Sequence, residues 1–389
     1  MAHSLPARAL KDVGRILRSD GVETPRRFLL TSYAASLFQE ATQFLPARSA
    51  SSPRVVIAYS VKTNPLPELL DLVRDSGMWA EAITQCEVAH AIKHGIAPEH
   101  TVLNGPGKWW PERVQVPAYG AIFCDSIQEL RNLYPRVADG RVKTRCLGVR
   151  LRPATVNSRF GIDLSDPRVF SEVVRTLKRL PSGQGIGFHF HMASSMVGVR
   201  TWRYLAENFI TAVQVMIGHI GTRPSTISFG GGWHPDDWTA FLRRDFQKLA
   251  GACRRHLPTV QRIILEPGKA LSQRAMCLLT RVLEIRRAPG HTEMVVDGSI
   301  AELPDVRSHP HRIVSRTSSG KVGLWGHGSD RVLGRLCMEF DILADAARIP
   351  RYVKEGDYVA FLDAGAYDAS MAYHFSRGFV ASLPKPGSL

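Results

Sequence analysis

A lysine at the end of a buried apolar run is the first residue whose position suggests chemistry. Residues 55–58 are all apolar and predict a buried strand, and Lys62 follows just before a turn at Asn64 and Pro65. A lysine kept from bulk water in this way loses its charge more readily and can attack a carbonyl group to form a Schiff base. Because most lysines at strand ends are simply solvated, Lys62 acquires meaning only from the residues that accompany it.

Short apolar runs alternate with amphipathic segments between residues 55 and 268. The predicted strands are residues 55–60, 79–84, 101–105, 121–126, 146–152, 185–192, 226–230 and 262–266. The segments between them have the periodicity of helices, most clearly at 67–76, 200–219 and 235–256. Eight such alternations predict an α/β fold, a (β/α)8 TIM-like barrel whose parallel strands are buried on both faces.

The pattern changes after Pro267. Apolar runs at residues 276–286, 292–297, 312–316, 321–325, 331–337 and 358–362 are separated by Gly, Pro and Ser turns. They predict an all-β domain, an antiparallel barrel or sandwich. The predicted organisation is an N-terminal segment (1–30) that joins the β-domain, a barrel domain (31–272) and the C-terminal β-domain (273–389).

Polar residues follow the predicted barrel strands where each one ends. They are Lys62, Glu81, Asn104, Asp125, Asn157, His191 with Ser194, Gly230 to Gly232, and Glu266. The carboxyl ends of the strands in such a barrel meet on one rim, and barrel enzymes carry out their chemistry there. A complete series of polar strand ends therefore predicts an active site on this rim.

His189 and His191 lie two residues apart on the sixth predicted strand and therefore share one of its faces. Two histidines in this arrangement can bind a metal ion, as the His-x-His pair of metal-dependent barrel hydrolases does. That pair usually lies on the first strand of a barrel, whereas this one lies on the sixth. The favoured interpretation makes His189 a hydrogen-bonded core residue, and the metal site remains the alternative.

Three consecutive glycines, Gly230, Gly231 and Gly232, follow the seventh predicted strand and precede a helix that opens at Pro235. Residues without side chains allow backbone N–H groups to approach an anion, and the N-terminus of a helix adds a favourable dipole. The glycines therefore predict a phosphate-binding loop, with a simple flexible turn as the alternative.

The motifs together resemble those of one enzyme family. The segments are Tyr59-Ser60-Val61-Lys62-Thr63-Asn64, Asn157 to Asp163, His191-Met192-Ala193-Ser194, Gly230-Gly231-Gly232, Glu266-Pro267-Gly268, Gly334 to Asp341 around Cys337, and Asp363 to Tyr367. They resemble, in the same order, the motifs of fold-type III pyridoxal phosphate (PLP) enzymes, the alanine racemase-like fold. The resemblance is closest to the ornithine, diaminopimelate and arginine decarboxylases, and it extends from Thr24 to Tyr367.

The resemblance implies a cofactor and a set of roles. PLP is expected as an imine on Lys62, with His191 stacked on its ring, and the three glycines, Ser194 and Tyr367 at its phosphate. Glu266 is expected to keep the pyridine nitrogen protonated, which makes the ring a strong electron sink and favours decarboxylation over racemisation. Cys337 is expected to return a proton to the product from the partner subunit of a homodimer. Lys269 replaces the arginine of the family's Glu-Pro-Gly-Arg motif.

The residues that choose the substrate depart from the family pattern. Met338 stands directly after Cys337, where relatives that act on ornithine or diaminopimelate carry an acid, and Glu339 comes one residue later. Asp297 matches a family acid near the far end of the substrate, and Arg159 lies in a run like the family's Ser-Lys-Phe-Gly. With a net charge of +15, these departures predict a carboxylated amino-acid substrate, as in siderophore or natural-product assembly, or else a diaminopimelate- or ornithine-like one.

Composition excludes several other classes. At 44% hydrophobic residues and 389 residues in all, the chain can bury a full core. No apolar run approaches the roughly 18 residues of a membrane helix, and the N-terminus lacks the layout of a signal peptide. The six cysteines have no paired spacing, which predicts free thiols in the cytoplasm. The basic residues occur in short pairs without a nucleic-acid motif.

The alternatives left open are a PLP-dependent racemase, a metal-dependent barrel hydrolase and a catalytically silent binding protein.

Overall fold

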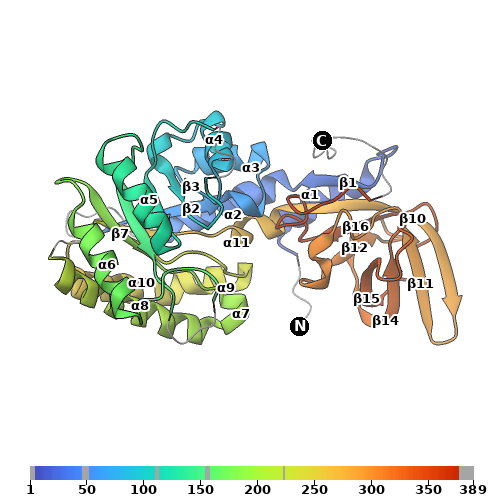
Figure 1. The fold of residues 1–389 in the computed structure, drawn as a ribbon. Coiled ribbons are helices and arrows are strands. Elements are labelled where there is room, and N and C mark those ends of the chain that lie inside the picture. The colour runs from blue at the N-terminus through green and yellow to red at the C-terminus, as the bar shows by residue number, and fades with distance from the viewer. Residues whose placement is uncertain (1–4, 46–51, 110–113, 154–157, 222–223, 376–389) are drawn as a thin grey trace. The chain divides into compact units, whose positions relative to one another are not determined.

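The computed structural model describes residues 5–45, 52–109, 114–153, 158–221 and 224–375 (Figure 1). The chain divides into two compact units. One unit is Phe38–Ala270, and the other combines Met1–Leu37 with Leu271–Leu389. Each unit contains its own sheet, so each is described by itself.

The unit Phe38–Ala270 contains a closed barrel of parallel strands. The strands are β2 (Arg54–Ser60), β3 (Trp79–Ala82), β4 (Thr101–Leu103), β5 (Ala121–Cys124), β6 (Cys146–Arg150), β7 (Gly185–His189), β8 (Thr226–Ser228) and β9 (Arg262–Leu265). β9 pairs with β2 and closes the ring. The eight-stranded barrel predicted from the sequence is confirmed. Most strands end earlier than predicted, because the polar residues that terminate them already lie on the loops.

The inner face of the barrel is built in layers. Every second residue of a strand points inward, and a central layer of such residues forms one apolar cluster: Val56, Ala58, Trp79, Val102, Ala121, Phe123, Cys146 and Ile264. One step of alternation beyond this layer, toward the carboxyl ends, the inward positions are polar, as at Ser60, Glu81 and Glu266. The apolar layer therefore closes the barrel beneath a polar C-terminal rim.

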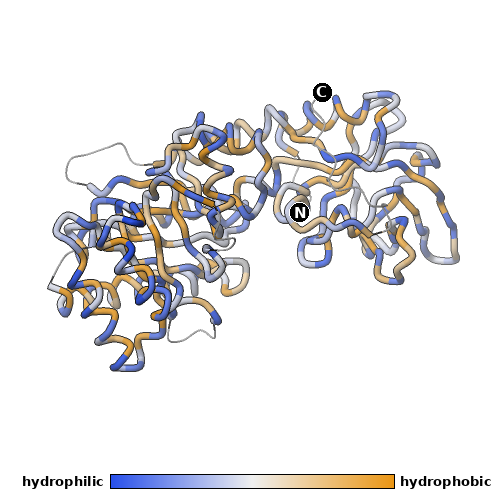
Figure 2. Tube along the Cα trace, turned by 45° about the horizontal axis from the view of Figure 1, so that its top comes forward, coloured by the Kyte–Doolittle hydropathy of each residue, from blue (hydrophilic) through white to orange (hydrophobic). Residues whose placement is uncertain are grey.

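Helices surround the barrel and carry the connections. They are α2 (Thr31–Gln43), α3 (Pro67–Asp75), α4 (Gln85–Lys93), α5 (Ile127–Ala138), α6 (Pro167–Lys178), α7 (Ser194–Val197), α8 (Val199–Ile220), α9 (Pro235–Ala240), α10 (Phe246–His256) and α11 (Lys269–Ser272). Hydrophobic and hydrophilic residues alternate along these helices, as amphipathic packing requires (Figure 2). The helix predicted at 235–256 is interrupted by a π-helical turn at Phe241–Asp245. Within the described chain, no helix is both long and apolar enough to cross a membrane.

The other unit is a mainly antiparallel sheet. Its strands are β1 (Arg26–Leu29), β10 (Met276–Ala288), β11 (His291–Val296), β12 (Ile313–Arg316), β13 (Val322–Leu324), β14 (Gly326–Leu333), β15 (Ile342–Arg348) and β16 (Tyr358–Leu362), and helix α1 (Ala7–Arg18) also belongs to it. The strand order is β13-β12-β16-β10-β11-β14-β15, with β1 also paired to β10. Only β11 and β14 pair in parallel among these described strands. The separate β-domain predicted from the sequence is confirmed.

One predicted strand of this domain is wrong in its position. Residues 331–337 were expected to form a strand, but β14 ends at Leu333 and Cys337 lies in the turn that follows. Asp341 closes this turn, since its carboxylate accepts the backbone N–H of Leu336 at 2.7 Å and its own carbonyl accepts that of Gly334 at 2.8 Å. β15, which begins directly after Asp341, was missed because its sequence, ILADAAR, resembles a helix more than a strand.

Candidate active site

Lys62 lies in a single 3-10 turn, Val61–Thr63, directly after β2. Its Nζ donates to both carboxylate oxygens of Glu81, at 2.8 Å and 3.1 Å, and to Ser60 Oγ at 2.8 Å. The Lys62 side chain is 28% exposed, whereas that of Glu81 is 1% exposed. Ser60 also donates to Glu81. The amine is therefore accessible and held in one place, with a buried carboxylate beside it that can accept its proton.

Glu266 follows β9 and is buried among hydrogen-bond donors. Ser228 Oγ donates to Oε1 at 2.7 Å, while Asn104 Nδ2 and His189 Nε2 lie 3.2 Å and 3.1 Å from Oε2. Burial by itself would raise the pKa of the Glu266 carboxyl. The nearby imidazoles and the Ser228 hydroxyl outweigh burial and lower this pKa to about 2. A buried carboxylate that stays ionised can hold a proton on a basic group placed against it.

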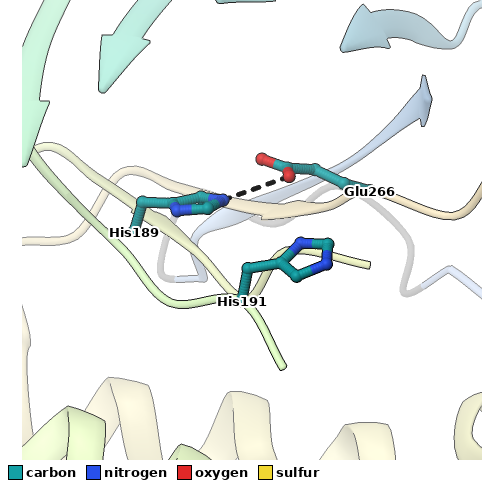
Figure 3. A group of neighbouring side chains, drawn as sticks. All are labelled: His189, His191 and Glu266. Atoms are coloured by element: carbon teal, nitrogen blue, oxygen red, sulfur yellow. Dashed lines mark hydrogen bonds and ion pairs between the residues drawn. The ribbon is translucent and has the colours of Figure 1, made fainter. Parts of the chain in front are cut away.

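The three residues His189, His191 and Glu266 lie close together at the ends of β7 and β9, the two strands that flank β8 (Figure 3). The two imidazole rings are 6.1 Å apart between centroids and inclined by 27°. The prediction that His189 is a hydrogen-bonded core residue is confirmed, since the residue is 1% exposed and contacts Glu266.

His191 has a defined protonation state. The backbone N–H of Gly231 donates to His191 Nδ1 at 3.1 Å, so Nδ1 carries no proton and the neutral ring bears its proton on Nε2. Burial, followed by the charges of Arg150 and Lys62, lowers the pKa of His191 well below its usual value. The ring therefore stays neutral at ordinary pH and offers a flat, uncharged face.

The glycine loop fits against its neighbours so tightly that side chains are excluded. A Cβ on Gly231 would lie 2.0 Å from the carbonyl oxygen of Glu266, and one on Gly232 would lie 2.5 Å from the Cα of Ala193. Gly230 and Gly232 also have positive φ angles of 62° and 86°. The loop is a backbone cradle that leads into α9.

Ser194 lies beside this cradle and is buried. Its hydroxyl lies 3.1 Å from Asp237 Oδ2 and 3.4 Å from the carbonyl oxygen of Gly232. Gly268, the glycine of the Glu-Pro-Gly motif, packs on the lysine segment, because a Cβ there would lie 2.0 Å from Thr63 Oγ1. Lys269 follows it, buried at the start of α11. The structure thus brings together Lys62, His191, Ser194, the glycines and Glu266 within one unit.

Arg150 is a rim residue that the motif analysis missed. It ends β6, is 8% exposed, and its guanidinium lies 3.4 Å from Asp125 Oδ1 and 4.8 Å from the centroid of the Phe160 ring. The signal for it was the alternation of β6, in which Cys146, Gly148 and Arg150 share the inward face. Asn157, predicted on the same rim, lies outside the described residues.

Arg159, which was predicted to bind substrate, is exposed and stacks on the ring of its neighbour Phe160. Its guanidinium lies 4.3 Å from the Phe160 ring centroid, so Phe160 contacts both Arg159 and Arg150. Its role toward a substrate stays a prediction.

The remaining predicted site residues belong to the β-domain unit. Cys337 and Glu339 are exposed in the turn between β14 and β15, whereas Met338 is partly buried against the core of that unit. Asp297 accepts the backbone N–H of Arg281 at 2.8 Å and the hydroxyl of Thr24. Tyr367 lies in a turn with a positive φ of 66°. Asp297 therefore has a structural task in its own unit, and its predicted part in substrate binding is not tested by these contacts.

The donor atoms of His189, His191 and Glu266 lie within 4.8 Å of one another, which is compatible with a metal ion. Two observations oppose this use. Glu266 already accepts three hydrogen bonds, and His191 Nδ1 already accepts one from Gly231. The Glu266 carboxylate and His191 Nδ1 are thus already engaged in hydrogen bonds.

Comparison with known proteins decides between the classes. A family model described as "Pyridoxal-dependent decarboxylase, pyridoxal binding domain" matches residues 38–273, more than half of the chain. The chain belongs to the pyridoxal-dependent decarboxylases. The fold-type III family and the carboxy-lyase class predicted from the sequence are therefore confirmed, and so is the preference for this class over a metal-dependent hydrolase.

Individual relatives agree with this family over most of their length. The diaminopimelate decarboxylase of Aquifex aeolicus is 25% identical over 373 residues, which cover 90% of this chain and 86% of the relative. The ornithine decarboxylase of Schizosaccharomyces pombe is 26% identical over 359 residues, 86% of this chain and 78% of the relative. The crystal structure of lysine/ornithine decarboxylase with putrescine from Vibrio vulnificus has a TM-score of 0.73 at 19% identity and covers 95% of this chain and 96% of its own. That last likeness shows the fold alone.

Proposed function

We propose that this decarboxylase holds pyridoxal 5'-phosphate through Lys62 and removes the Cα carboxylate of an amino acid as CO2. The observation that supports this most is that one barrel rim carries both an accessible amine, at Lys62, and a buried, ionised carboxylate, at Glu266. The side-chain-free cradle of Gly230 to Gly232 fits a phosphate group, because only backbone can approach there. The neutral face of His191 fits a stacked aromatic ring.

The residues have distinct tasks in the proposed reaction. When bound, PLP supplies an aldehyde that captures an amine and a ring that withdraws the electrons left by the departing CO2. Glu81 accepts a proton from Lys62 Nζ, which makes the amine nucleophilic. Glu266 would keep a proton on the pyridine nitrogen, while His189 and Ser228 keep the Glu266 carboxylate ionised and Asn104 helps to hold it in position.

Cys337 is proposed to return a proton to Cα in a homodimer, with Cys337 supplied by the partner subunit, as the family resemblance implies. Its exposure in the turn between β14 and β15 leaves the thiol accessible for such a task. Ser194, Tyr367 and the glycines are proposed phosphate contacts. We place the protein in the cytoplasm because all six of its cysteines are free thiols.

The proposed substrate is an amino acid with an additional carboxylate, as in siderophore or natural-product assembly. Met338 packs against the core of its unit in the position where diamine-forming relatives carry an acid, and Glu339 is exposed. Two arginines, Arg150 and Arg159, contact Phe160 and can pair with a substrate carboxylate. Turnover of lysine, ornithine, arginine or diaminopimelate at ordinary efficiency would contradict this choice. The relatives named above include enzymes for diaminopimelate and ornithine, so these are the natural comparison substrates.

The test of the cofactor proposal is the visible absorbance of the purified protein. Wild type is expected to show an absorbance band that borohydride bleaches, and Lys62→Ala is expected to lack it. Lys93→Ala, which removes an exposed lysine of α4, is the matched control and should keep the band. A colourless wild-type protein that takes up no added PLP would refute the proposal. Screening for CO2 release from carboxylated amino acids then identifies the substrate.

A further inference from the structure

The barrel carries a second cluster of charged residues at the opposite end from Lys62. Arg54 and Arg262 are the first residues of β2 and β9, and they are direct partners in the parallel ladder that closes the barrel. By alternation, Arg54 lies on the same face as Val56 and Ala58, and Arg262 on that of Ile264, all of which belong to the apolar inner layer. Both arginines therefore begin inward-facing rows at the N-terminal mouth of the barrel.

Arg262 is held against the apolar layer. Its guanidinium lies 4.9 Å from the centroid of the Trp79 ring, and Trp79 also stacks on His100 with ring centroids 5.2 Å apart and an interplanar angle of 18°. Among the residues that the structure describes, the Arg262 guanidinium makes one hydrogen bond, a long one of 3.4 Å from Nη1 to Thr226 Oγ1. Within the described residues, its buried Nε has no partner and the side chain has no carboxylate to pair with. A cation fixed on an aromatic floor in this way is preorganised for an anion.

The surroundings of Arg262 add positive charge. Arg54 and Arg145 both act on Arg262 and on His100, and their repulsion adds to the effect of burial, which is the largest cause of the lowered pKa of Arg262. Burial, followed by the charges of Arg54 and Arg145, also lowers the pKa of His100. Among the described residues, the acid that faces this group is Glu99, which lies 3.6 Å from Arg145. Within the described residues, this one carboxylate accompanies three guanidinium groups, of which it contacts that of Arg145.

Such an arrangement costs stability without a counter-ion. Like charges near one another repel, and a fold keeps such a cluster when a ligand uses it. Guanidinium groups bind oxyanions through two parallel N–H···O bonds, which suits phosphate and carboxylate groups alike. Arg54 and Arg145 are exposed and accessible from solvent. We propose that the N-terminal mouth of the barrel, formed by Arg54, Arg145 and Arg262 over Trp79, is a binding site for a small, multiply charged oxyanion.

The site is independent of the proposed decarboxylase chemistry, since it lies beneath the apolar layer that closes the barrel. The test is calorimetric titration of the PLP-loaded enzyme with pyrophosphate and, separately, with citrate. Loading fills the proposed phosphate cradle, and the two probes distinguish a phosphate-type ligand from a polycarboxylate. Wild type is expected to bind at least one of them saturably.

The variant Arg54→Gln/Arg145→Gln removes two exposed charges and leaves Arg262 and Trp79 in place. Its Kd for the bound probe is expected to rise by about tenfold or more. The matched control is Arg141→Gln/Arg286→Gln, which removes two exposed arginines that are paired with Asp139 and Glu284 elsewhere on the surface. The control is expected to change the Kd by less than about twofold.

Three results overturn the proposal: no saturable binding of either probe by wild type, an unchanged Kd in the Arg54/Arg145 variant, or an equal loss of affinity in the control. The last result would mean that net charge alone attracts the anion. The variants identify the site without reference to the cofactor, so they also decide the matter in a preparation that binds no PLP.

Discussion

The contact between Ser194 and Asp237 allows a specific prediction about the affinity of the protein for PLP. Ser194 Oγ lies 3.1 Å from Asp237 Oδ2, next to the glycine cradle. A hydroxyl has one proton to donate, so it cannot serve the carboxylate and a bound phosphate at the same time. Asp237 therefore competes with the phosphate for Ser194, and Asp237→Asn is expected to tighten PLP binding.

The magnitude follows from the geometry. A phosphate oxygen that accepts from Ser194 at about 2.7 Å would lie about 5 Å from the Asp237 carboxylate. Two unit charges at about 5 Å repel by about 3 kcal/mol at an effective dielectric constant of about 20. Asp237 is only half-buried, so solvent screening reduces this figure toward about 1 kcal/mol. The dissociation constant for PLP is expected to fall by about 5- to 150-fold.

The assay is a titration of the apoprotein with PLP, followed by absorbance or by quenching of tryptophan fluorescence. Pyridoxal, which lacks the phosphate, is the comparison ligand, and its affinity should not change in Asp237→Asn. Asp236→Asn is the matched control, because Asp236 occupies the same helical turn but is exposed. The double variant Ser194→Ala/Asp237→Asn should bind PLP no better than Ser194→Ala. An unchanged Kd for PLP, or an equal gain for pyridoxal, would refute the reasoning.

Four further predictions concern the residues of the proposed site. Glu266→Gln is expected to reduce decarboxylation by roughly 100-fold or more while PLP still binds, as steady-state kinetics with an absorbance control would show. Because the folded pKa of Glu266 is lowered to about 2, its stabilising contribution is complete above the pKa of the unfolded chain and is lost as the pH falls through the folded value. The free energy of unfolding of wild type should therefore decline more steeply than that of Glu266→Gln between about pH 5 and about pH 3; parallel curves would contradict the lowered pKa. Cys337→Ala is expected to lose turnover but retain the PLP absorbance band. Mixing it with Lys62→Ala should restore about a quarter of wild-type activity if subunits share sites, and no activity if they do not. Dialysis against a chelator should leave the rate of decarboxylation unchanged. A loss of activity that added zinc restores would instead indicate that His189 and His191 bind a metal ion.

The sequence predicted the parts of the site that depend on backbone position. Lys62, His191 and Glu266 lie at or just beyond the ends of strands. The end of a strand can be predicted to within about three residues from the apolar run that forms it. The glycine loop was also predictable, because three consecutive glycines follow a predicted strand. The structure gives the reason for them, since the loop lies so close to Glu266 and Ala193 that no Cβ fits. The alternation of strands and helices in the barrel could be predicted from the periodicity of the apolar residues alone.

The parts that failed depend on side-chain contacts and on strand facing, which no motif records. Cys337 was expected on a strand because residues 331–337 contain an apolar run. Instead, Asp341 closes the chain into a turn, since its carboxylate accepts the N–H of Leu336 and its backbone carbonyl accepts that of Gly334. Arg150 was missed because no motif contains it, although the alternation along β6 places it on the same inward face as Cys146 and Gly148. The bond between Ser194 and Asp237 joins two segments 43 residues apart and has no signature in the chain.

The alternation that builds the barrel also explains why polar chemistry occurs at both of its ends. Each inward row of a strand is apolar in the middle, since Ala58, Trp79 and Ile264 must fill the interior. The row can be polar only above and below that layer. On β9 the row reads Arg262, Ile264, Glu266, so one strand carries a guanidinium at the N-terminal mouth, an aliphatic plug, and the buried carboxylate of the rim. The same period of two that places Glu266 on the C-terminal rim therefore places Arg262 at the N-terminal mouth, and the two ends can be changed separately because an apolar layer lies between them.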